Sequence, residues 1–152
     1  MIIFDLDGTL ADISHRRHLV EDKKNKNFPL FYAMCKDDKP NAPVIRILHA
    51  LQYLEIFPDI QIWSGRSDEV RSETVDWLAE HVFQSKHVAN NALARMRKAG
   101  DYTQDHILKE KWLKEELANG TRIDMVFDDR DRVVQMWRSY GITCLQVADG
   151  NF

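Results

Sequence analysis

Apolar residues along the chain fall into two patterns, short continuous runs and longer segments with an apolar residue every three or four positions. Short apolar runs bounded by turn residues are typical of buried strands, and the longer spacing is typical of helices with one buried face. Strands are predicted at residues 1–5, 60–63, 123–127 and 143–147, with a weaker one at 87–91. Helices are predicted at 43–54, 68–81, 105–118 and 131–140. This alternation predicts a three-layer α/β fold around a mostly parallel sheet with right-handed crossovers.

The buried faces of two predicted helices follow from their spacing. In the helix that Pro43 opens and Pro58 ends, the inward positions are Val44, Ile47, Leu48, Leu51 and Leu54. In the helix over 105–118, which Asn119 and Gly120 end, they are Ile107, Leu108, Trp112 and Leu117. Ser67 and Asp68 are expected to cap the helix over 68–81.

Residues 14–42 lack either pattern and contain Pro29 and Pro40. A long irregular segment directly after the first strand predicts a small flap or cap over the edge of the sheet. Its apolar residues are expected to pack onto the body, although an aromatic surface for a nucleic-acid base is the alternative. These residues are Phe28, Phe31, Tyr32 and Met34.

Composition limits the class of protein. With 152 residues the chain is long enough for one domain with a core, so we expect a single domain over 1–152 with an insertion at about 14–42. No apolar run approaches the roughly 20 residues that cross a bilayer, and no signal peptide is visible, which predicts a cytoplasmic protein without membrane contact. Cys35 and Cys144 are expected to be free thiols. The net charge of −3 gives no global attraction to nucleic acid, so a polymer would have to bind local basic runs such as 15–18, 23–24 and 95–98.

The end of the first strand carries the strongest candidate chemistry. Asp5 and Asp7 stand one residue apart, followed by Gly8. Ligands of open parallel sheets bind at the carboxyl ends of the strands, and two neighbouring acids can divide the roles of nucleophile or metal ligand and proton donor. The alternative is an ordinary strand followed by an Asx-type turn. The run Asp5-Leu6-Asp7-Gly8-Thr9 resembles motif I, DxDGT, of the haloacid dehalogenase (HAD) superfamily, which implies its Rossmann-like fold with a small cap.

Two further strand ends are expected at the same edge. Ser64 and Arg66 follow the second strand, and Asp128 and Asp129 follow a later one. Four carboxylates together would repel one another unless they shared a cation, and oxygen ligands without Cys or His favour Mg²⁺. A helix cap is the alternative role for the pair Asp128-Asp129.

The order of these residues resembles the HAD phosphatases throughout. Ser64 stands for motif II, Lys109 for the motif III lysine, with Lys111 or Lys114 as alternatives, and Asp128-Asp129 for motif IV. In phosphoryl transfer, Ser64 and the backbone at Gly65 can hold phosphate oxygens, while Lys109 and Mg²⁺ neutralise charge.

A closer resemblance is to the 3′-phosphatase domain of phage polynucleotide kinase-phosphatase. It is carried by Ser64-Gly65-Arg66, Arg97-x-x-Gly100-Asp101, Asp105, Lys109 and the stretch from Asp128 to Phe152. This resemblance implies that Arg16, Arg66 and Arg97 hold phosphate or the nucleic-acid backbone, and that Asp105 orients Lys109 or another basic group. The chain departs from it in three ways: it has no GxxxxGK[ST] loop of a kinase, Thr103 replaces an expected Arg, and 23–38 does not align clearly.

The function implied is a Mg²⁺-dependent phosphomonoesterase in nucleic-acid end healing, with Asp5 as nucleophile and Asp7 as acid and base. Mg²⁺ would be held by Asp5, the backbone carbonyl of Asp7, and Asp128 or Asp129, with Asp129 the preferred direct ligand. The preferred substrate is a 3′-phosphate on a polynucleotide end. The alternatives are a phosphatase of free nucleotides or other small esters, and a non-catalytic domain that retains phosphate on Asp. A separate kinase or ligase partner and a phage setting are further expectations.

Overall fold

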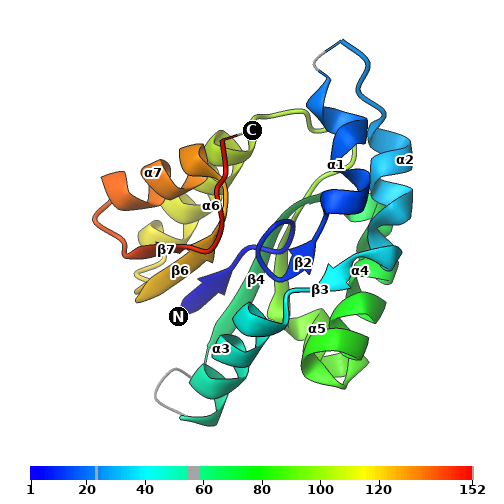
Figure 1. Cartoon of the computed structure of the whole chain (residues 1–152). Coiled ribbons are helices and arrows are strands. Elements are labelled where there is room, and N and C mark those ends of the chain that lie inside the picture. Colours follow the sequence, from blue (N-terminus) through cyan, green and yellow to red (C-terminus); the bar gives the residue numbers. More distant parts are fainter. Residues whose placement is uncertain (23, 55–58, 152) are drawn as a thin grey trace.

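The computed structural model describes residues 1–22, 24–54 and 59–151 (Figure 1). Within that part of the chain, the main sheet has five parallel strands in the order β5-β4-β1-β6-β7. Their bounds are Ile2–Phe4 (β1), Ile60–Ser67 (β4), Leu93–Arg97 (β5), Met125–Asp128 (β6) and Cys144–Gln146 (β7). The predicted parallel α/β sheet is therefore confirmed. Three predictions lie outside the described residues: Pro58 as helix end, Lys23 in a basic pair, and Phe152 in the tail.

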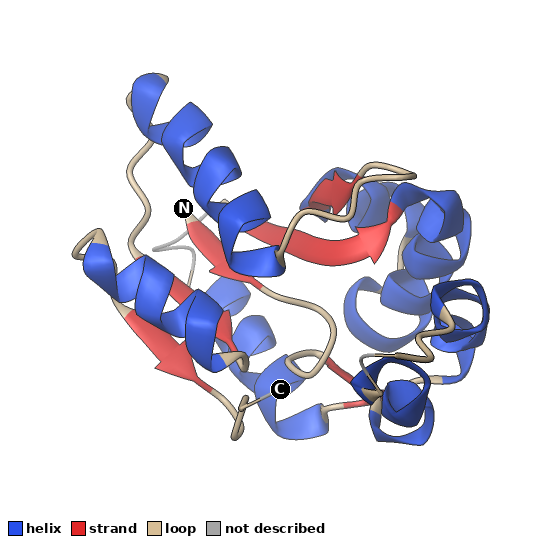
Figure 2. Cartoon of the chain, turned by 90° about the horizontal axis from the view of Figure 1, so that it is seen from above, coloured by secondary structure: helices blue, strands red, loops and turns tan. Residues whose placement is uncertain are grey.

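Helices cover both faces of the sheet, which gives the three predicted layers (Figure 2). One face is covered by α3 (Ala42–Tyr53), α4 (Arg71–Leu78) with the short turns η2 (Asp68–Val70) and η3 (Ala79–Phe83), and α5 (Lys86–Ala92). The other face is covered by α6 (Asp105–Ala118) and α7 (Asp131–Ser139).

Strand β1 lies at the centre and is buried on both faces, which explains its unbroken apolar run. Ile2 and Phe4 pack toward α3, α4 and α5, and Phe4 stacks on Phe127 with ring centroids 4.4 Å apart. Ile3 points the other way, into a core with Trp63 and Trp137. Because side chains alternate across a strand, this burial fixes the register of β1 and with it the position of the residues that follow.

The segment after β1, where the sequence predicts an irregular insertion, contains regular secondary structure. Strands β2 (Ala11–Asp12) and β3 (Lys39–Pro40) pair antiparallel at its base. Between them lie helices α1 (Ser14–Glu21) and α2 (Phe28–Ala33) and the 3₁₀ turn η1 (Met34–Asp37). The Asn27 side chain caps α2, whose first turn contains Pro29. A proline is favourable at that position, so Pro29 opens a helix here where the sequence prediction had only a loop. Phe31 is buried, whereas Phe28, Tyr32 and Met34 are partly buried.

The predicted strand at 87–91 is wrong. These residues belong to α5, whose first turn is capped by Ser85, and the strand follows at Leu93–Arg97. In β5 only Leu93 and Met96 are buried, so its apolar pattern is too sparse to predict a strand at the sheet edge. The residue predicted to begin a loop, Arg97, instead ends this strand.

Some positions predicted to face inward are exposed. In α3, Ile47 is 45% exposed and Ile45 is buried, and Leu54, which follows the helix as its C-cap residue, is 54% exposed. In α6, whose bounds match the prediction, Ile107 and Leu117 are 46% and 44% exposed, while Leu113 and Lys109 are buried. The buried face of α6 includes the charged side chain of Lys109, which a pattern of hydrophobic residues cannot predict.

The predicted helix over 68–81 divides into η2, α4 and η3, and of its two predicted cap residues Ser67 accepts from the Glu69 amide. Two other predictions are confirmed. Gly120 and Gly141 follow α6 and α7 with positive φ, and Cys35 and Cys144 are free and buried. Among the described residues, no helix is long and apolar enough to cross a membrane.

Candidate active site

The carboxyl ends of β1, β4 and β6 meet at one edge of the sheet because these strands are direct neighbours. The Asp5 amide donates to the Phe127 carbonyl at 2.9 Å, which holds Asp5 beside the end of β6. Strand β4 is longer than predicted and its pairing with β5 shifts register between Ser64 and Ser67. Such irregularities re-aim side chains next to active sites. The structure thus brings the predicted residues of all three strand ends together.

Three carboxylates, Asp5, Asp128 and Asp129, form what we call the acidic cluster. One oxygen of each lies within 4.8 Å of the others, and the residues are 5%, 1% and 2% exposed. Lys109 of α6 reaches them from the other side, with its Nζ 2.6 Å from Asp5 Oδ1 and 2.8 Å from Asp128 Oδ2. Of the three candidate lysines, Lys109 is the one that the structure places in the site.

The charges of the acidic cluster are strongly coupled. Burial raises the pKa of Asp5 well above its usual value, Lys109 opposes this, and Asp128 and Asp129 raise it further. Burial and the neighbouring Asp128 raise the pKa of Asp129 to about 6. Burial lowers the pKa of Lys109, but the surrounding aspartates outweigh it and raise that pKa, so the ammonium stays charged.

The acidic cluster fits a hard divalent cation. Asp129 Oδ2 is buried and has no hydrogen-bond partner among the described residues, which is costly unless a cation or water satisfies it. Gly8, at φ +91°, leaves room for it, since a Cβ there would lie 2.0 Å from Asp129 Oδ2. Carboxylate oxygens without nitrogen or sulfur are the ligands that Mg²⁺ prefers. The residues present therefore suit Mg²⁺.

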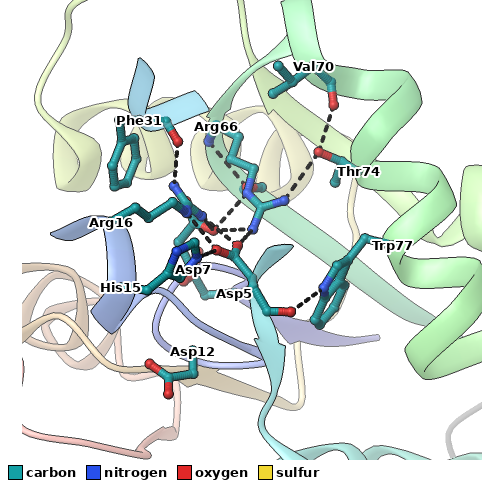
Figure 3. A network of polar contacts seen from close by, with 12 residues as sticks. Asp5, Asp7, Asp12, His15, Arg16, Phe31, Arg66, Val70, Thr74 and Trp77 are labelled. Atoms are coloured by element: carbon teal, nitrogen blue, oxygen red, sulfur yellow. Dashed lines mark hydrogen bonds and ion pairs between the residues drawn. The ribbon is translucent and has the colours of Figure 1, made fainter. Parts of the chain in front are cut away.

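Asp7 lies in a different environment (Figure 3). Its Oδ1 accepts from Arg16 Nη2 at 2.9 Å and from Arg66 Nε at 2.7 Å. Burial raises the pKa of Asp7, but the two guanidinium groups outweigh it and lower the pKa below its usual value. The Asp7 side chain is thus bound by cations and is not among the carboxylates of the acidic cluster.

A residue that the sequence did not reveal completes this network. Asp38, 3% exposed, accepts from Arg16 Nε and Nη2, both at 2.6 Å, and from Arg66 Nη2. It lies after η1 in the segment without clear alignment, and no periodicity or motif marks it. The only sequence signal is an acidic residue without an assigned role in the segment 14–42, which also contains Arg16.

Arg97, Gly65 and Asp105 contact one another next to Lys109. Arg97 donates to the backbone carbonyls of Gly65 at 2.8 Å and Thr103 at 2.5 Å, and to Asp105 at 3.3 Å. Asp105 Oδ2 lies 3.5 Å from Lys109 Nζ, as expected of a residue that orients it. A Cβ at Gly65 would lie 2.3 Å from Asp105 Oδ1, so only glycine fits there. These contacts of Arg97 stabilise a loop, whereas the sequence resemblance implied that Arg97 binds phosphate or the nucleic-acid backbone.

Ser64 is fully buried, and its Oγ accepts from the backbone amide of Arg66 at 3.2 Å. This contact orients the backbone of the strand end, where amides can meet phosphate oxygens.

A parallel sheet with acids at the ends of its central strands is the architecture of the HAD hydrolases. The chain is similar to a haloacid dehalogenase-like hydrolase, SP0104 from Streptococcus pneumoniae, with a TM-score of 0.53 and 14% identity over 95% of this chain and 82% of that one. At this identity the likeness shows the fold.

The family follows from a match along the whole chain. The family model for the phosphatase domain of polynucleotide kinase PNKP matches residues 1–152, and the chain belongs to this family. It is therefore a HAD-type phosphatase.

Two solved structures are similar at higher identity. One is of a Pnkp1/Rnl/Hen1 RNA repair complex and the other of a Pnkp1/Rnl/Hen1 complex, each with a TM-score of 0.75 and 29% identity over 99% of this chain. The match covers 43% and 46% of those chains, so this chain spans less than half of their length.

Proposed function

We propose that this phosphatase removes 3′-phosphate from polynucleotide ends, with Mg²⁺, through an aspartyl-phosphate intermediate on Asp5. The observation that supports this best is the contrast between two neighbouring acids. Asp5 lies in the acidic cluster beside Lys109, and Asp7 lies against Arg16 and Arg66. A nucleophile and an acid–base group need such different surroundings.

The reaction has two steps. An Asp5 oxygen attacks phosphorus in line, the bond to the leaving 3′-oxygen breaks, and Asp7 gives that oxygen a proton. Asp7 then takes a proton from water, which attacks phosphorus and releases phosphate and Asp5. A bound phosphate shares the guanidinium groups of Arg16 and Arg66, which weakens their hold on Asp7 and lets its pKa rise toward that of a proton donor.

Other residues of the chain bind and orient. Arg16, Arg66 and the backbone amides after Ser64 hold phosphate oxygens, because guanidinium donors form a fork that suits them. Lys109, held by Asp105, keeps Asp5 in position. Mg²⁺ would be bound by Asp5, the backbone carbonyl of Asp7, and Asp128 or Asp129, with Asp129 preferred. When bound, it neutralises charge on the transferring phosphoryl group.

The family and the repair complexes among the similar structures support a polynucleotide substrate. We further propose a single cytoplasmic domain whose insertion at about 14–42 is a small cap that leaves room for a strand end, and a role in nucleic-acid repair, in a phage setting. The similar structures are of complexes with Rnl and Hen1, which supports a kinase or ligase partner as part of the same proposal.

The alternative is a phosphatase of free nucleotides or other small esters. The net charge of −3 favours it, since polymer binding draws on basic surface. The other alternative, a non-catalytic domain that retains phosphate on Asp, is not supported, because the family is one of phosphatases. Such a domain would also have no need of Asp7 as an acid and base.

The deciding experiment measures phosphate release, with Mg²⁺ and with EDTA, from a 3′-phosphorylated oligonucleotide, its 5′-phosphorylated counterpart and a 3′-mononucleotide. We expect Mg²⁺-dependent release that is fastest from the 3′-phosphorylated oligonucleotide, in its DNA or RNA form. Equal or faster release from the mononucleotide would contradict the proposal of a polynucleotide substrate. It would not contradict the proposed role of Asp5 as nucleophile.

A further inference from the structure

Asp38 is the buried carboxylate beside the reacting residues that the proposed reaction does not use. Its two oxygens meet the guanidinium of Arg16 through Nε and Nη2, an arrangement that fixes the plane of the group. Its Oδ2 also accepts from Arg66 Nη2. One carboxylate thus orients both arginines that flank Asp7.

The arginines have few other restraints. Arg16 donates its Nη1 to the Phe31 carbonyl at 3.3 Å and lies 4.1 Å from the Phe31 ring centroid. Arg66 donates its Nη1 to Thr74 Oγ1 at a long 3.4 Å. Both arginine side chains are fully buried. Without Asp38, the guanidinium groups of Arg16 and Arg66 would share the single carboxylate of Asp7 and would turn toward it.

Asp38 is itself held from the body of the protein. Its backbone carbonyl accepts from the indole Nε1 of Trp77 in α4 at 2.8 Å. His15, one third exposed, contacts its Oδ1 at 2.9 Å. Asp38 and Arg16 belong to the insertion, whereas Arg66 and Trp77 belong to the body. The carboxylate therefore fastens the end of the insertion at the place where both arginines meet Asp7.

We propose that Asp38 is a positioning residue that holds Arg16 and Arg66 in the orientation that binds the substrate phosphate. This inference rests on the proposed function, because it takes the two arginines as its phosphate-binding groups. Asp38 contacts the reacting phosphate only through them. It also neutralises one of the two positive charges, so that Asp7 is not required to neutralise both.

The test compares Asp38→Asn with Asp37→Asn, a matched change at the adjacent exposed carboxylate. Binding of inorganic phosphate in the presence of Mg²⁺ is measured by calorimetry, and KM and kcat are measured on a 3′-phosphorylated oligonucleotide. Misplaced phosphate-binding groups cost a large factor in affinity, so we expect Asp38→Asn to raise the phosphate dissociation constant and KM about tenfold or more. Asp37→Asn should match the wild type.

A purely structural role gives a different result. A partly unfolded variant loses kcat in proportion to its inactive fraction, while the folded fraction keeps the wild-type KM and phosphate dissociation constant, and that outcome would overturn the inference. Should Asp38→Asn not fold, Asp38→Glu keeps the charge but displaces the carboxylate by one methylene, and it should still weaken phosphate binding severalfold. Phosphate binding as in the wild type, in either folded variant, would also overturn the inference.

Failure of the proposed function gives a separate result. A wild-type protein that hydrolyses none of the 3′-phosphorylated substrates refutes that function, while calorimetry with inorganic phosphate still reports on Asp38. A wild-type protein that binds no inorganic phosphate refutes the inference.

Discussion

At the scale of single residues, two aspartates separated by one position have opposite electrostatic surroundings. Asp5 has a raised pKa among carboxylates, and Asp7 has a lowered pKa between arginines. The difference arises because the chain turns out of the sheet between them, so that they face different neighbours. One short turn thus separates the proposed nucleophile from the proposed acid–base group.

Replacing Asp5 by Asn should remove activity without loss of the fold. The amide cannot act as a nucleophile, so phosphate release should fall at least about a thousandfold. Removal of a buried charge that Asp128 and Asp129 repel offsets the lost ion pair with Lys109, so the Tm should change by only a few degrees. Thermal unfolding and phosphate release, measured on the same sample, check both. Substantial remaining turnover would contradict the role of Asp5, and Asp7→Asn should give the same loss.

Gly8→Ala should disable the metal site, whereas Gly120→Ala should not. Both glycines have positive φ, but a Cβ at Gly8 meets Asp129 Oδ2 at 2.0 Å and a Cβ at Gly120 has no atom within 4 Å. Gly120→Ala should cost about 1 kcal/mol from backbone strain alone. Gly8→Ala should cost about 3 kcal/mol and shift the Mg²⁺ dependence of activity to higher concentrations. Equal Mg²⁺ dependence in the two variants would contradict this account of Gly8.

The site could be predicted from sequence where residues follow a strand directly. Asp5, Ser64 and Asp128 come at the ends of apolar runs, and a parallel sheet brings such ends together. Asp38 could not be predicted, because its position depends on how an insertion folds back onto Arg16 and on a hydrogen bond from Trp77. Neither contact leaves a periodic signal.

At the scale of secondary structure, helix α6 carries Asp105 and Lys109 and is tied to the edge strand. Arg95 of β5 makes ion pairs with Glu115 and Glu116 near the end of α6. The hydrogen bond from Arg95 lowers the pKa of Glu116, a partly buried group. These ion pairs stabilise the far end of the helix that carries Lys109.

The ion pair between Arg95 and Glu116 predicts a pH-dependent effect of Glu116→Gln. A carboxyl whose pKa is lowered on folding adds stability above its unfolded pKa, and the addition is lost as the pH falls through the folded value. Glu116→Gln should therefore cost about 0.5–1 kcal/mol at pH 7, and the difference from wild type should shrink below the usual value of 4.5. Urea unfolding at several pH values measures it. A cost that does not vary with pH would indicate lost packing instead.

Predictions from hydrophobic patterns failed where an element buries few apolar residues or buries a charged one. The strand β5 at the sheet edge buries only Leu93 and Met96, so its pattern resembles a loop. Helix α6 was predicted with the right bounds, yet two of its inward positions were wrong because Lys109 takes part of its buried face. Hydrophobic spacing locates an element well but assigns its face poorly when a charge is buried there.

At the scale of the whole molecule, we expect stability to depend on a metal bound by the acidic cluster. A cation that binds only the folded state should stabilise it by about 2.7 kcal/mol at 100 times its dissociation constant, or roughly 5–10 °C in Tm. We expect Mg²⁺ to raise the Tm of the wild type and to have no such effect on Asp129→Asn. Without metal at pH 7.5, Asp129→Asn should unfold at a higher temperature than the wild type, because burial and Asp128, which raise the pKa of Asp129 to about 6, make its charge oppose folding.

The control for this prediction is Asp76→Asn, which changes an exposed carboxylate on α4. It should keep the full response to Mg²⁺. A response that survives in Asp129→Asn would place the bound metal elsewhere.

The central place of β1 also determines when the active site can assemble during synthesis. Ile2 pairs with Ile60 on one side and with Met125 on the other, and Lys109 reaches Asp5 across 104 positions of sequence. Pairings between such distant segments form slowly. Asp5 is therefore translated well before its partners and meets Lys109 and Asp128 only after α6 and β6 have left the ribosome, so a nascent or truncated chain that ends before β6 lacks the proposed site for phosphate transfer.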